Sequence, residues 1–200
     1  MASPLAELFD DLNAVFDVTN SRWYLFGAQA AIIHGASRLT ADVDITVMLG
    51  DSPVETLVNT LTQKGFDLRI SKVIEFVAQT KILPVMHIKS GIPVDIVLGG
   101  PGLEEEFAKR AHQYDFDGIK IPVASKEDII AMKILSGREK DLDDALAIIA
   151  SQTEQLDIDH IKSILKILED ALDRNDLQSI LDDLIHRVHD QSSSYDTRLK

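Results

Sequence analysis

The sequence predicts an α/β fold, α+β in layout, in which helices flank a mixed β-sheet and a helical part follows at the C-terminus. Three features of the chain support this prediction. Residues 23–47 read as strand, tight turn, helix, loop and strand. Residues 82–88 and 92–98 are two further apolar runs rich in β-branched residues, and a hairpin signal separates them. From residue 125 onward the apolar spacing is helical throughout.

The N-terminal residues are predicted to form a helix that leads into the first strand. Ser3 suits the N-cap and Pro4 the first turn, and the apolar residues that follow keep a helical spacing. The strand at residues 23–26 is aromatic and apolar. Gly27 ends this strand, and a short helix is expected over residues 28–33.

The middle of the chain is predicted to continue with alternating helices and strands. Ser52, Pro53 and Glu55 read as the N-cap, the first helical residue and the capping-box partner of one helix. A short strand is expected at residues 66–70. Residues 72–80 fit either a short helix or a turn.

The later part of the chain is predicted to be helical, except for one strand or hairpin. A helix is expected over residues 103–112, and residues 116–123 contain the strand or hairpin, which turns at Asp117-Gly118. Four C-terminal helices are expected at residues 126–136, 140–151, 158–173 and 177–190. We therefore expect a core of residues 1–124 and a C-terminal helical part of residues 125–200.

Composition bounds the class of protein. The hydrophobic content of 45% supports a real core, and no apolar run is long enough to span a membrane. No signal peptide is visible, and the absence of cysteine excludes disulfides and thiolate metal sites. We expect a cytoplasmic protein without a membrane partner. The formal net charge of −13 disfavours nonspecific binding to nucleic acid.

Three aspartates are the candidate metal ligands. Asp42 and Asp44 flank Val43 at the start of a strand, so both carboxylates project to one face, near the Gly27 turn. Carboxylates so placed repel each other unless a cation lies between them, and a hard divalent cation suits oxygen ligands. Asp95 interrupts an apolar strand and needs a partner, which the same metal would supply. The simpler alternative for Asp42 and Asp44 is a solvated loop before a strand.

This combination resembles the nucleotidyltransferase fold of the DNA polymerase β superfamily. The family pattern is an apolar residue, Gly, then Gly or Ser, a gap, an Asp-apolar-Asp segment, and a third acidic residue on a later strand. The matching segments are Phe26-Gly27-Ala28, Asp42-Val43-Asp44 and Asp95, and Arg38-Leu39-Thr40-Ala41-Asp42 looks like the Arg-x-Thr-x-Asp lead-in of bacterial members. Residues 1–124 would then be a nucleotidyltransferase core. Ala28 departs from the pattern, because it keeps the backbone N–H but supplies no hydroxyl.

A second segment carries the cations of the candidate site. Residues 133–144 are similar to the Lys…Arg-x-Lys-Asp-x-x-Asp segment of AbiEii/MenT-like nucleotidyltransferases. Lys133, Arg138 and Lys140 would face a triphosphate, and Asp141 would orient Lys133 or Arg138. The alternative for these residues is charge pairing and capping at helix ends. Arg38 and Thr40 have an equally plain alternative, which is to cap and brace their loop.

The resemblance implies a metal-dependent transfer of a nucleoside monophosphate from an NTP such as ATP to an acceptor. The acceptor would be RNA such as tRNA, a protein or a small molecule, and the cofactor would be two Mg²⁺ ions, with Mn²⁺ as a substitute. The catalytic residues would be Asp42, Asp44, Asp95 and Lys133, of which the three aspartates bind metal. The nucleotide-binding residues would be Gly27, Ala28, Arg38, Thr40, Lys133, Arg138, Lys140 and Asp141.

Two other functions fit the same residues. The first is a catalytically silent nucleotide-binding or protein-interaction module, which the departure at Ala28 favours and the presence of all three aspartates opposes. The second is an enzyme with a small-molecule acceptor, as in antibiotic nucleotidyltransferases, which the acidic charge favours over long nucleic acid. The AbiEii/MenT resemblance implies instead tRNA as the acceptor, a toxin role and an antitoxin protein as partner.

Overall fold

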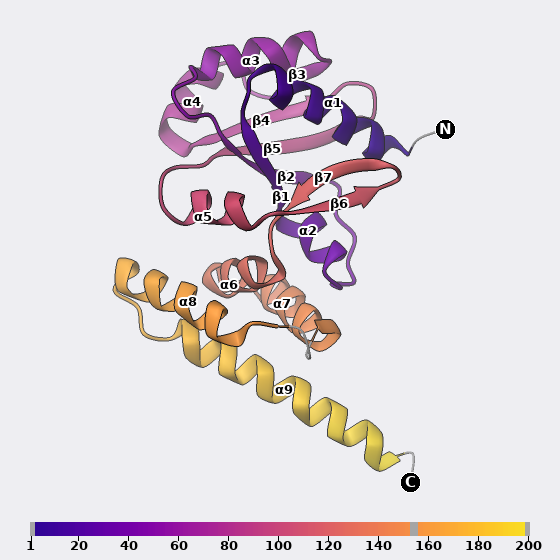
Figure 1. The fold of residues 1–200 in the computed structure, drawn as a ribbon, viewed down its shortest axis with the longest axis vertical. Coiled ribbons are helices and arrows are strands. Elements are labelled where there is room, and N and C mark those ends of the chain that lie inside the picture. The colour runs from indigo at the N-terminus through magenta and orange to yellow at the C-terminus, as the bar shows by residue number, and fades with distance from the viewer. Residues whose placement is uncertain (1–2, 153–155, 199–200) are drawn as a thin grey trace. The chain divides into compact units, whose positions relative to one another are not determined.

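The structure is a computed structural model that describes residues 3–152 and 156–198. The chain forms two compact units, each with its own core (Figure 1). Unit 1 consists of Met1–Gln29 and Leu39–Ser125, and unit 2 consists of Ala30–Arg38 and Lys126–Lys200. Unit 1 therefore contains the sheet, and unit 2 joins one internal segment of the chain to the C-terminal helices.

Within the described residues, unit 1 is built on one seven-stranded sheet of order β3-β4-β5-β2-β1-β7-β6. Its strands are β1 (Arg22–Phe26), β2 (Val43–Met48), β3 (Phe66–Leu68), β4 (Ile82–His87), β5 (Ile92–Leu98), β6 (His112–Phe116) and β7 (Ile119–Val123). Two neighbouring pairs, β2 with β5 and β1 with β7, are parallel, and the other pairs are antiparallel. The sheet is therefore mixed, as the sequence predicts.

The central strand β2 buries its apolar side chains on one face of the sheet. Val43, Ile45 and Val47 of β2 are buried with no exposed surface, and the residues between them face the other side. The helices of unit 1 are α1 (Pro4–Val18), α3 (Val54–Gln63), α4 (Val73–Thr80) and α5 (Leu103–Arg110). Helix α1 packs on α3 and β7, and α5 packs on β1 and β2.

Helix α1 begins and faces the core as its sequence predicts. The Ser3 hydroxyl accepts a hydrogen bond from the Ala6 N–H, which satisfies one of the unpaired donors of the first turn. Its buried side chains are Ala6, Leu8, Phe9, Leu12, Val15 and Phe16. Helix α2 (Gly27–Ile33) follows β1 directly, and residues 27–29 of this helix belong to unit 1 and residues 30–33 to unit 2.

Unit 2 is helical in all the residues that the structure describes there. Its helices are the end of α2, α6 (Lys126–Ser136), α7 (Glu139–Gln152), α8 (Ile158–Leu172) and α9 (Leu177–Arg198). Helix α6 packs on α7 and α8, and α9 packs on α7, α8 and α6. Leu177, Leu181, Leu184 and Val188 form the buried stripe of α9. No helix among the described residues of either unit has the length and apolar character that crossing a membrane requires.

The structure corrects several local predictions and decides one that the sequence left open. Ser52 does not cap α3, because the helix begins at Val54 after Pro53, and no side chain caps it. Helix α5 ends at Arg110. The strand β6 starts at once, so the hairpin that turns at Asp117-Gly118 is longer than the sequence indicates. The ambiguous residues 72–80 are mostly helix α4, and α9 continues beyond residue 190 to Arg198.

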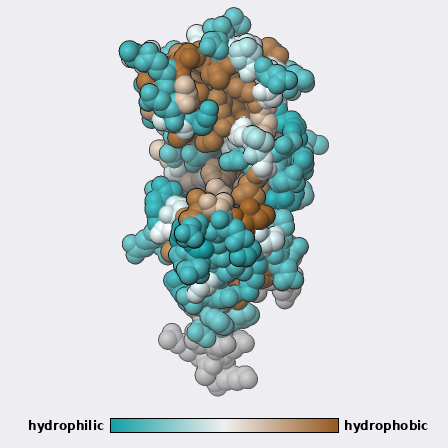
Figure 2. All heavy atoms as spheres, turned by 90° about the vertical axis from the view of Figure 1, so that its left-hand side faces the viewer, coloured by the Kyte–Doolittle hydropathy of each residue, from teal (hydrophilic) through white to brown (hydrophobic). Residues whose placement is uncertain are grey.

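The surface of unit 1 keeps some apolar side chains in contact with solvent. Figure 2 shows them gathered on the face turned toward the viewer, within a hydrophilic border. Leu68 at the end of β3 and Ile74 in α4 are among the exposed large apolar residues of this unit. Folded proteins commonly expose apolar atoms to this extent, so the feature by itself does not indicate a binding surface.

Candidate active site

The parallel pairing of β2 and β5 brings Asp44 and Asp95 together. The register places Asp44 opposite Asp95, and the preceding pair, Val43 and Val94, is fully buried on the other face. Both aspartates are half-buried, since they project to the side that the core does not fill. Two of the three predicted metal-ligating carboxylates therefore lie side by side on one face of the sheet.

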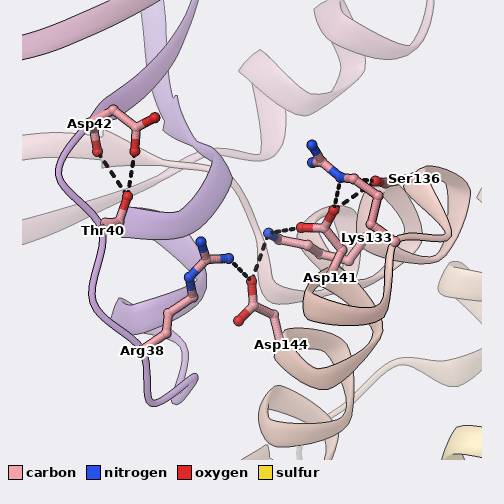
Figure 3. Close-up of polar contacts among 8 residues, drawn as sticks. Arg38, Thr40, Asp42, Lys133, Ser136, Asp141 and Asp144 are labelled. Carbon is pink, nitrogen blue, oxygen red and sulfur yellow. Dashed lines mark hydrogen bonds and ion pairs between the residues drawn. The ribbon is translucent and has the colours of Figure 1, made fainter.

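The third carboxylate, Asp42, lies just before the first residue of β2. Its side chain is exposed and accepts a short hydrogen bond from the Thr40 hydroxyl, which also approaches the Asp42 carbonyl (Figure 3). Thr40 thus braces the turn that presents Asp42. This contact agrees with the alternative expectation that Thr40 braces its loop. It also fixes the direction of the Asp42 carboxylate.

Gly27 lies against the Asp44 carboxylate. Its φ of +65° is in the left-handed region, where residues other than glycine are strained, and a Cβ atom at this position would overlap Oδ2, Cγ and Cβ of Asp44. Phe26 pairs with Asp44 in the antiparallel register of β1 and β2, so the strand ends where the close approach begins. Ala28 follows and is 6% exposed. The glycine in the motif is therefore required by the position of Asp44.

Asp95 has a protein partner that the sequence does not indicate. Arg69, the residue after β3, approaches Asp95 Oδ1 with Nη1 at 2.8 Å. The Asp95 side chain is 37% exposed and that of Arg69 is 40% exposed. Asp95 therefore has a partner, as its place in an apolar strand predicts, but in the protein alone this partner is a guanidinium, and solvent also reaches the carboxylate.

The cations of the second motif form a buried network in unit 2. Lys133 of α6 is 7% exposed, and its Nζ donates to Asp141 Oδ1 at 2.6 Å and to Asp144 Oδ2 at 2.8 Å (Figure 3). Both carboxylates belong to α7, three residues apart on one side of the helix. Asp144 also accepts from Arg38 Nη1 at 2.9 Å. The network ties α6, α7 and the segment after α2 together.

Asp141 is held in its charged form by three donors. Burial raises the pKa of Asp141, but hydrogen bonds from Lys133, Ser136 and Arg138 outweigh it and lower the pKa from 3.8 to about 2. The Ser136 hydroxyl donates to Asp141 Oδ2 at 2.7 Å, and Arg138 Nε donates to the same oxygen. Asp141 therefore does orient Lys133 and Arg138, whose side chains are 9% and 65% exposed.

The predicted nucleotide-binding cations differ in how open they are to a ligand. Lys133 is enclosed by two carboxylates, whereas Arg138 and Lys140 are exposed and Arg38 is partly buried against Asp144. Ser136 and Asp144 complete the network, although neither is among the predicted site residues. The three-residue spacing of Asp144 from Asp141 is the signal in the sequence for the Asp144 contacts. Ser136 has no such signal.

The carboxylates of unit 1 fit a hard divalent cation by their chemistry. The Asp44–Asp95 pair offers oxygen ligands from adjacent strands, and the Gly27 backbone leaves the Asp44 side free of a Cβ. Among residues 3–152 and 156–198, no group of three or more His, Asp or Glu side chains is arranged to hold one ion. The fit thus rests on the Asp44–Asp95 pair, with Asp42 turned toward Thr40.

Comparison with protein families decides the class. Residues 3–192 match the family described as nucleotidyltransferase of unknown function (DUF6036). The chain belongs to this nucleotidyltransferase family. The match covers both units, so the C-terminal helices of this nucleotidyltransferase are part of the family pattern. No curated protein sequence matches the chain.

Solved structures show the same fold. A solution structure of the antibiotic-resistance factor ANT(2'')-Ia matches with a TM-score of 0.58 and 13% identity, over 86% of this chain and 95% of that one. A crystal structure of ANT(2'')-Ia in complex with adenylyl-2''-tobramycin gives 0.58 and 13%, over 85% and 99%. JHP933 from Helicobacter pylori gives 0.47 and 16%, with all of both chains covered. At these identities the ANT(2'')-Ia likeness establishes the fold of this nucleotidyltransferase and no more.

Proposed function

We propose that this protein transfers a nucleoside monophosphate from an NTP to an acceptor hydroxyl or phosphate, with divalent cations held by Asp44, Asp95 and Asp42. The observation that carries the proposal is the in-register pair Asp44–Asp95 beside the Gly27 turn. A sheet position that gathers two carboxylates on one face favours cation binding, since the charges otherwise repel. The family membership supports the same chemistry.

In this proposal the aspartates of unit 1 hold the metal ions, and exposed cations of unit 2 bind the phosphates. Bound Mg²⁺ or Mn²⁺ would neutralise charge on the triphosphate and lower the pKa of the acceptor hydroxyl. Asp44 and Asp42 would hold the metal–triphosphate complex. Asp95 would bind metal on the acceptor side and take up the proton of the acceptor hydroxyl. Arg138 and Lys140 are exposed and would be the cations for the phosphates. Lys133 stays between Asp141 and Asp144, and Asp141 in turn holds Arg138.

The charge of the protein favours a small or proteinaceous acceptor over a long nucleic acid. The formal net charge is −13, and a polyanion gains affinity mainly from cations that replace its counterions. Of the acceptors that the sequence leaves open, we therefore propose a small cationic molecule first. A structural relative carries adenylyl-2''-tobramycin in its crystal structure, and its fold is compatible with such an acceptor.

The test is an assay of the purified protein with each labelled NTP, Mg²⁺ and either a panel of small amines and aminoglycosides or total cell extract. Asp44→Asn should abolish transfer and metal-dependent NTP binding while the protein still unfolds cooperatively. Asp51→Asn, an exposed carboxylate just after β2, is the matched control and should leave both unchanged. Unchanged NTP affinity in Asp44→Asn would place the site elsewhere.

A toxin role is a finer proposal that rests on the AbiEii/MenT resemblance of residues 133–144. In that case expression of the wild-type chain arrests growth, and expression of Asp44→Asn does not. An antitoxin protein would relieve the arrest by binding the chain. Growth that is equal for the two forms would contradict the toxin role and would leave the transfer activity in place.

A further inference from the structure

Arg69 and Asp95 form an ion pair within one row of residues that crosses the sheet. The Arg69 N–H donates to the carbonyl of Pro84 at 3.1 Å, Pro84 is opposite Asp95, and Asp95 is opposite Asp44. The Arg69 side chain spans Pro84 to reach Asp95 Oδ1 at 2.8 Å. Because Pro84 carries no polar side chain, it does not compete for either partner.

Arg69 balances part of the negative charge of the two aspartates in this row. Asp44 and Asp95 are neighbours in register, and like charges so close destabilise each other. The Arg69 guanidinium compensates one of these charges in the protein without metal. A divalent cation at the same carboxylates would be repelled by the Arg69 charge, and the guanidinium already occupies Asp95 Oδ1.

The pair is built to open. Both side chains are more than one third exposed, so their separation costs little because water solvates the two charges. Buried pairs such as Lys133 with Asp141 are different, because separating them leaves a charge without solvent. The Arg69–Asp95 ion pair can therefore break and re-form each time a cation binds and leaves.

We propose that Arg69 is a built-in counter-ion that occupies Asp95 in the metal-free protein and competes with the divalent cation for it. Arg69 is then a positioning residue, because it acts through Asp95. Displacement from Asp95 leaves the guanidinium exposed beside the cation, where it can take an anionic oxygen of the nucleotide. The inference rests on the proposed metal site of Asp44 and Asp95.

Calorimetric titration with Mn²⁺ alone, without nucleotide, tests the competition. Arg69→Gln should bind Mn²⁺ about three- to tenfold more tightly than wild type, since the competing charge is gone. Arg69→Lys should stay close to wild type because it keeps the charge. Arg22→Gln is the matched control, an exposed arginine of the same sheet that pairs with Glu105 at 3.6 Å, and it should leave Mn²⁺ affinity unchanged.

Two further measurements keep the outcome decisive. In an Asp95→Asn background, Arg69→Gln should strengthen Mn²⁺ binding less than it does with Asp95 present, because the group for which Arg69 competes is absent. In the wild-type protein, Mg²⁺ titration should shift the ¹⁵Nε NMR resonance of Arg69 and leave that of Arg22 in place, which needs no variant to fold. Arg69→Gln affinity equal to or weaker than wild type, or a static Arg69 resonance at saturating Mg²⁺, would overturn the proposal.

The same experiment separates this inference from the proposed function. If Asp44→Asn and Asp95→Asn both leave Mn²⁺ affinity unchanged, the metal site itself is absent and the proposed function fails with it. If these variants weaken Mn²⁺ binding while Arg69→Gln does not strengthen it, only the role of Arg69 is wrong.

Discussion

Gly27 leaves no room for a side chain between its Cα atom and the carboxylate of Asp44. A Cβ atom there would overlap three atoms of Asp44, and the backbone is also in the left-handed region. The strand-ending glycine and Asp44, a proposed metal ligand, therefore depend on each other's position, although they are 17 residues apart in the chain. The glycine of the family motif has a steric cause in this protein.

Gly27→Ala should destabilise the protein and displace Asp44. The left-handed φ costs about 1–2 kcal/mol for a residue with a Cβ, and the overlap adds about 1–3 kcal/mol. Gly91→Ala is the control, because Gly91 has a similar φ of +68° and open space around it. Urea unfolding should show the larger loss for Gly27→Ala, and only this variant should lose Mn²⁺ affinity. Equal losses in both variants would mean that Asp44 moves aside without consequence.

The sheet was predictable because its strands carry strong local signals. The strand β5 has the predicted bounds and β2 begins at Val43 as predicted, since β-branched runs with flanking glycines are seldom helical. The first residues of strand β6 were missed, because His112 and the next residues are polar and exposed at a sheet edge, where no apolar alternation is required. The cap of α3 was misread because Ser52 and Glu55 have the right spacing while Pro53 takes the N-cap position.

The site was predictable only where a motif marks it. Asp44 and Asp95 are found from local patterns, and their register follows from pairing two strands that the sequence identifies. Arg69 was not predicted, since its partner lies 26 residues away and nothing near Arg69 distinguishes it from a surface arginine. Residues 30–38 also carry no local signal that they pack with the helices of unit 2, since tertiary contacts determine that association.

The buried network around Asp141 should make stability depend on pH in acid. The pKa of Asp141 is lowered in the folded protein to about 2, from 3.8. The folded state therefore binds this proton less readily than the unfolded state, and the contribution of Asp141, about 2 kcal/mol, is present above about pH 4 and lost as the pH falls to about 2. Asp141→Asn should lack this contribution, so its deficit relative to wild type shrinks over that range.

Guanidinium chloride unfolding at several pH values between about 2 and 5 measures this difference. Asp143→Asn is the matched control, because Asp143 is exposed on the same helix between the two network aspartates. Its difference from wild type should stay constant over the range. A constant deficit for Asp141→Asn as well would show that the pKa of Asp141 is not lowered.

Arg138→Ala should weaken NTP binding more than NMP binding. Arg138 is 65% exposed, so its loss costs little stability, and a charge-assisted contact with the β and γ phosphates is worth about 1.5–3 kcal/mol, or roughly 10- to 150-fold in affinity. Lys133→Ala is a poorer probe, because it leaves Asp141 and Asp144 as buried charges and costs about 3–5 kcal/mol of stability.

Calorimetry with an NTP and the corresponding NMP measures the two affinities of Arg138→Ala. Arg187→Ala, at an exposed position of α9, is the control and should bind both ligands like wild type. Losses of equal size for NTP and NMP would place Arg138 near the acceptor or limit it to the contact with Asp141.

Asp95→Asn should separate the enzyme from a silent binding module. The side chain is 37% exposed, so the variant loses an exposed ion pair to Arg69 and stays folded. Its affinity for Mn²⁺ alone falls, but the triphosphate supplies ligands that Asp42 and Asp44 support, so the metal–NTP affinity should remain within about tenfold, a shift of about 1.4 kcal/mol. Transfer to the acceptor should be lost, because Asp95 is the carboxylate proposed to act on the acceptor oxygen.

The control for Asp95→Asn is Asp67→Asn, an exposed carboxylate of β3 on the same sheet. It should transfer at the wild-type rate, so a loss confined to Asp95→Asn assigns the effect to the carboxylate pair. If Asp95→Asn transfers as fast as wild type, the catalytic role of Asp95 is wrong. A second outcome is that wild type binds NTP with metal but transfers nothing to any component of a cell extract, and that Asp95→Asn behaves identically. The chain would then be a binding module of the nucleotidyltransferase fold. The in-register position of Asp95 beside Asp44 predicts that transfer is lost only in Asp95→Asn. A module that only binds nucleotide has no need of a second carboxylate for an acceptor.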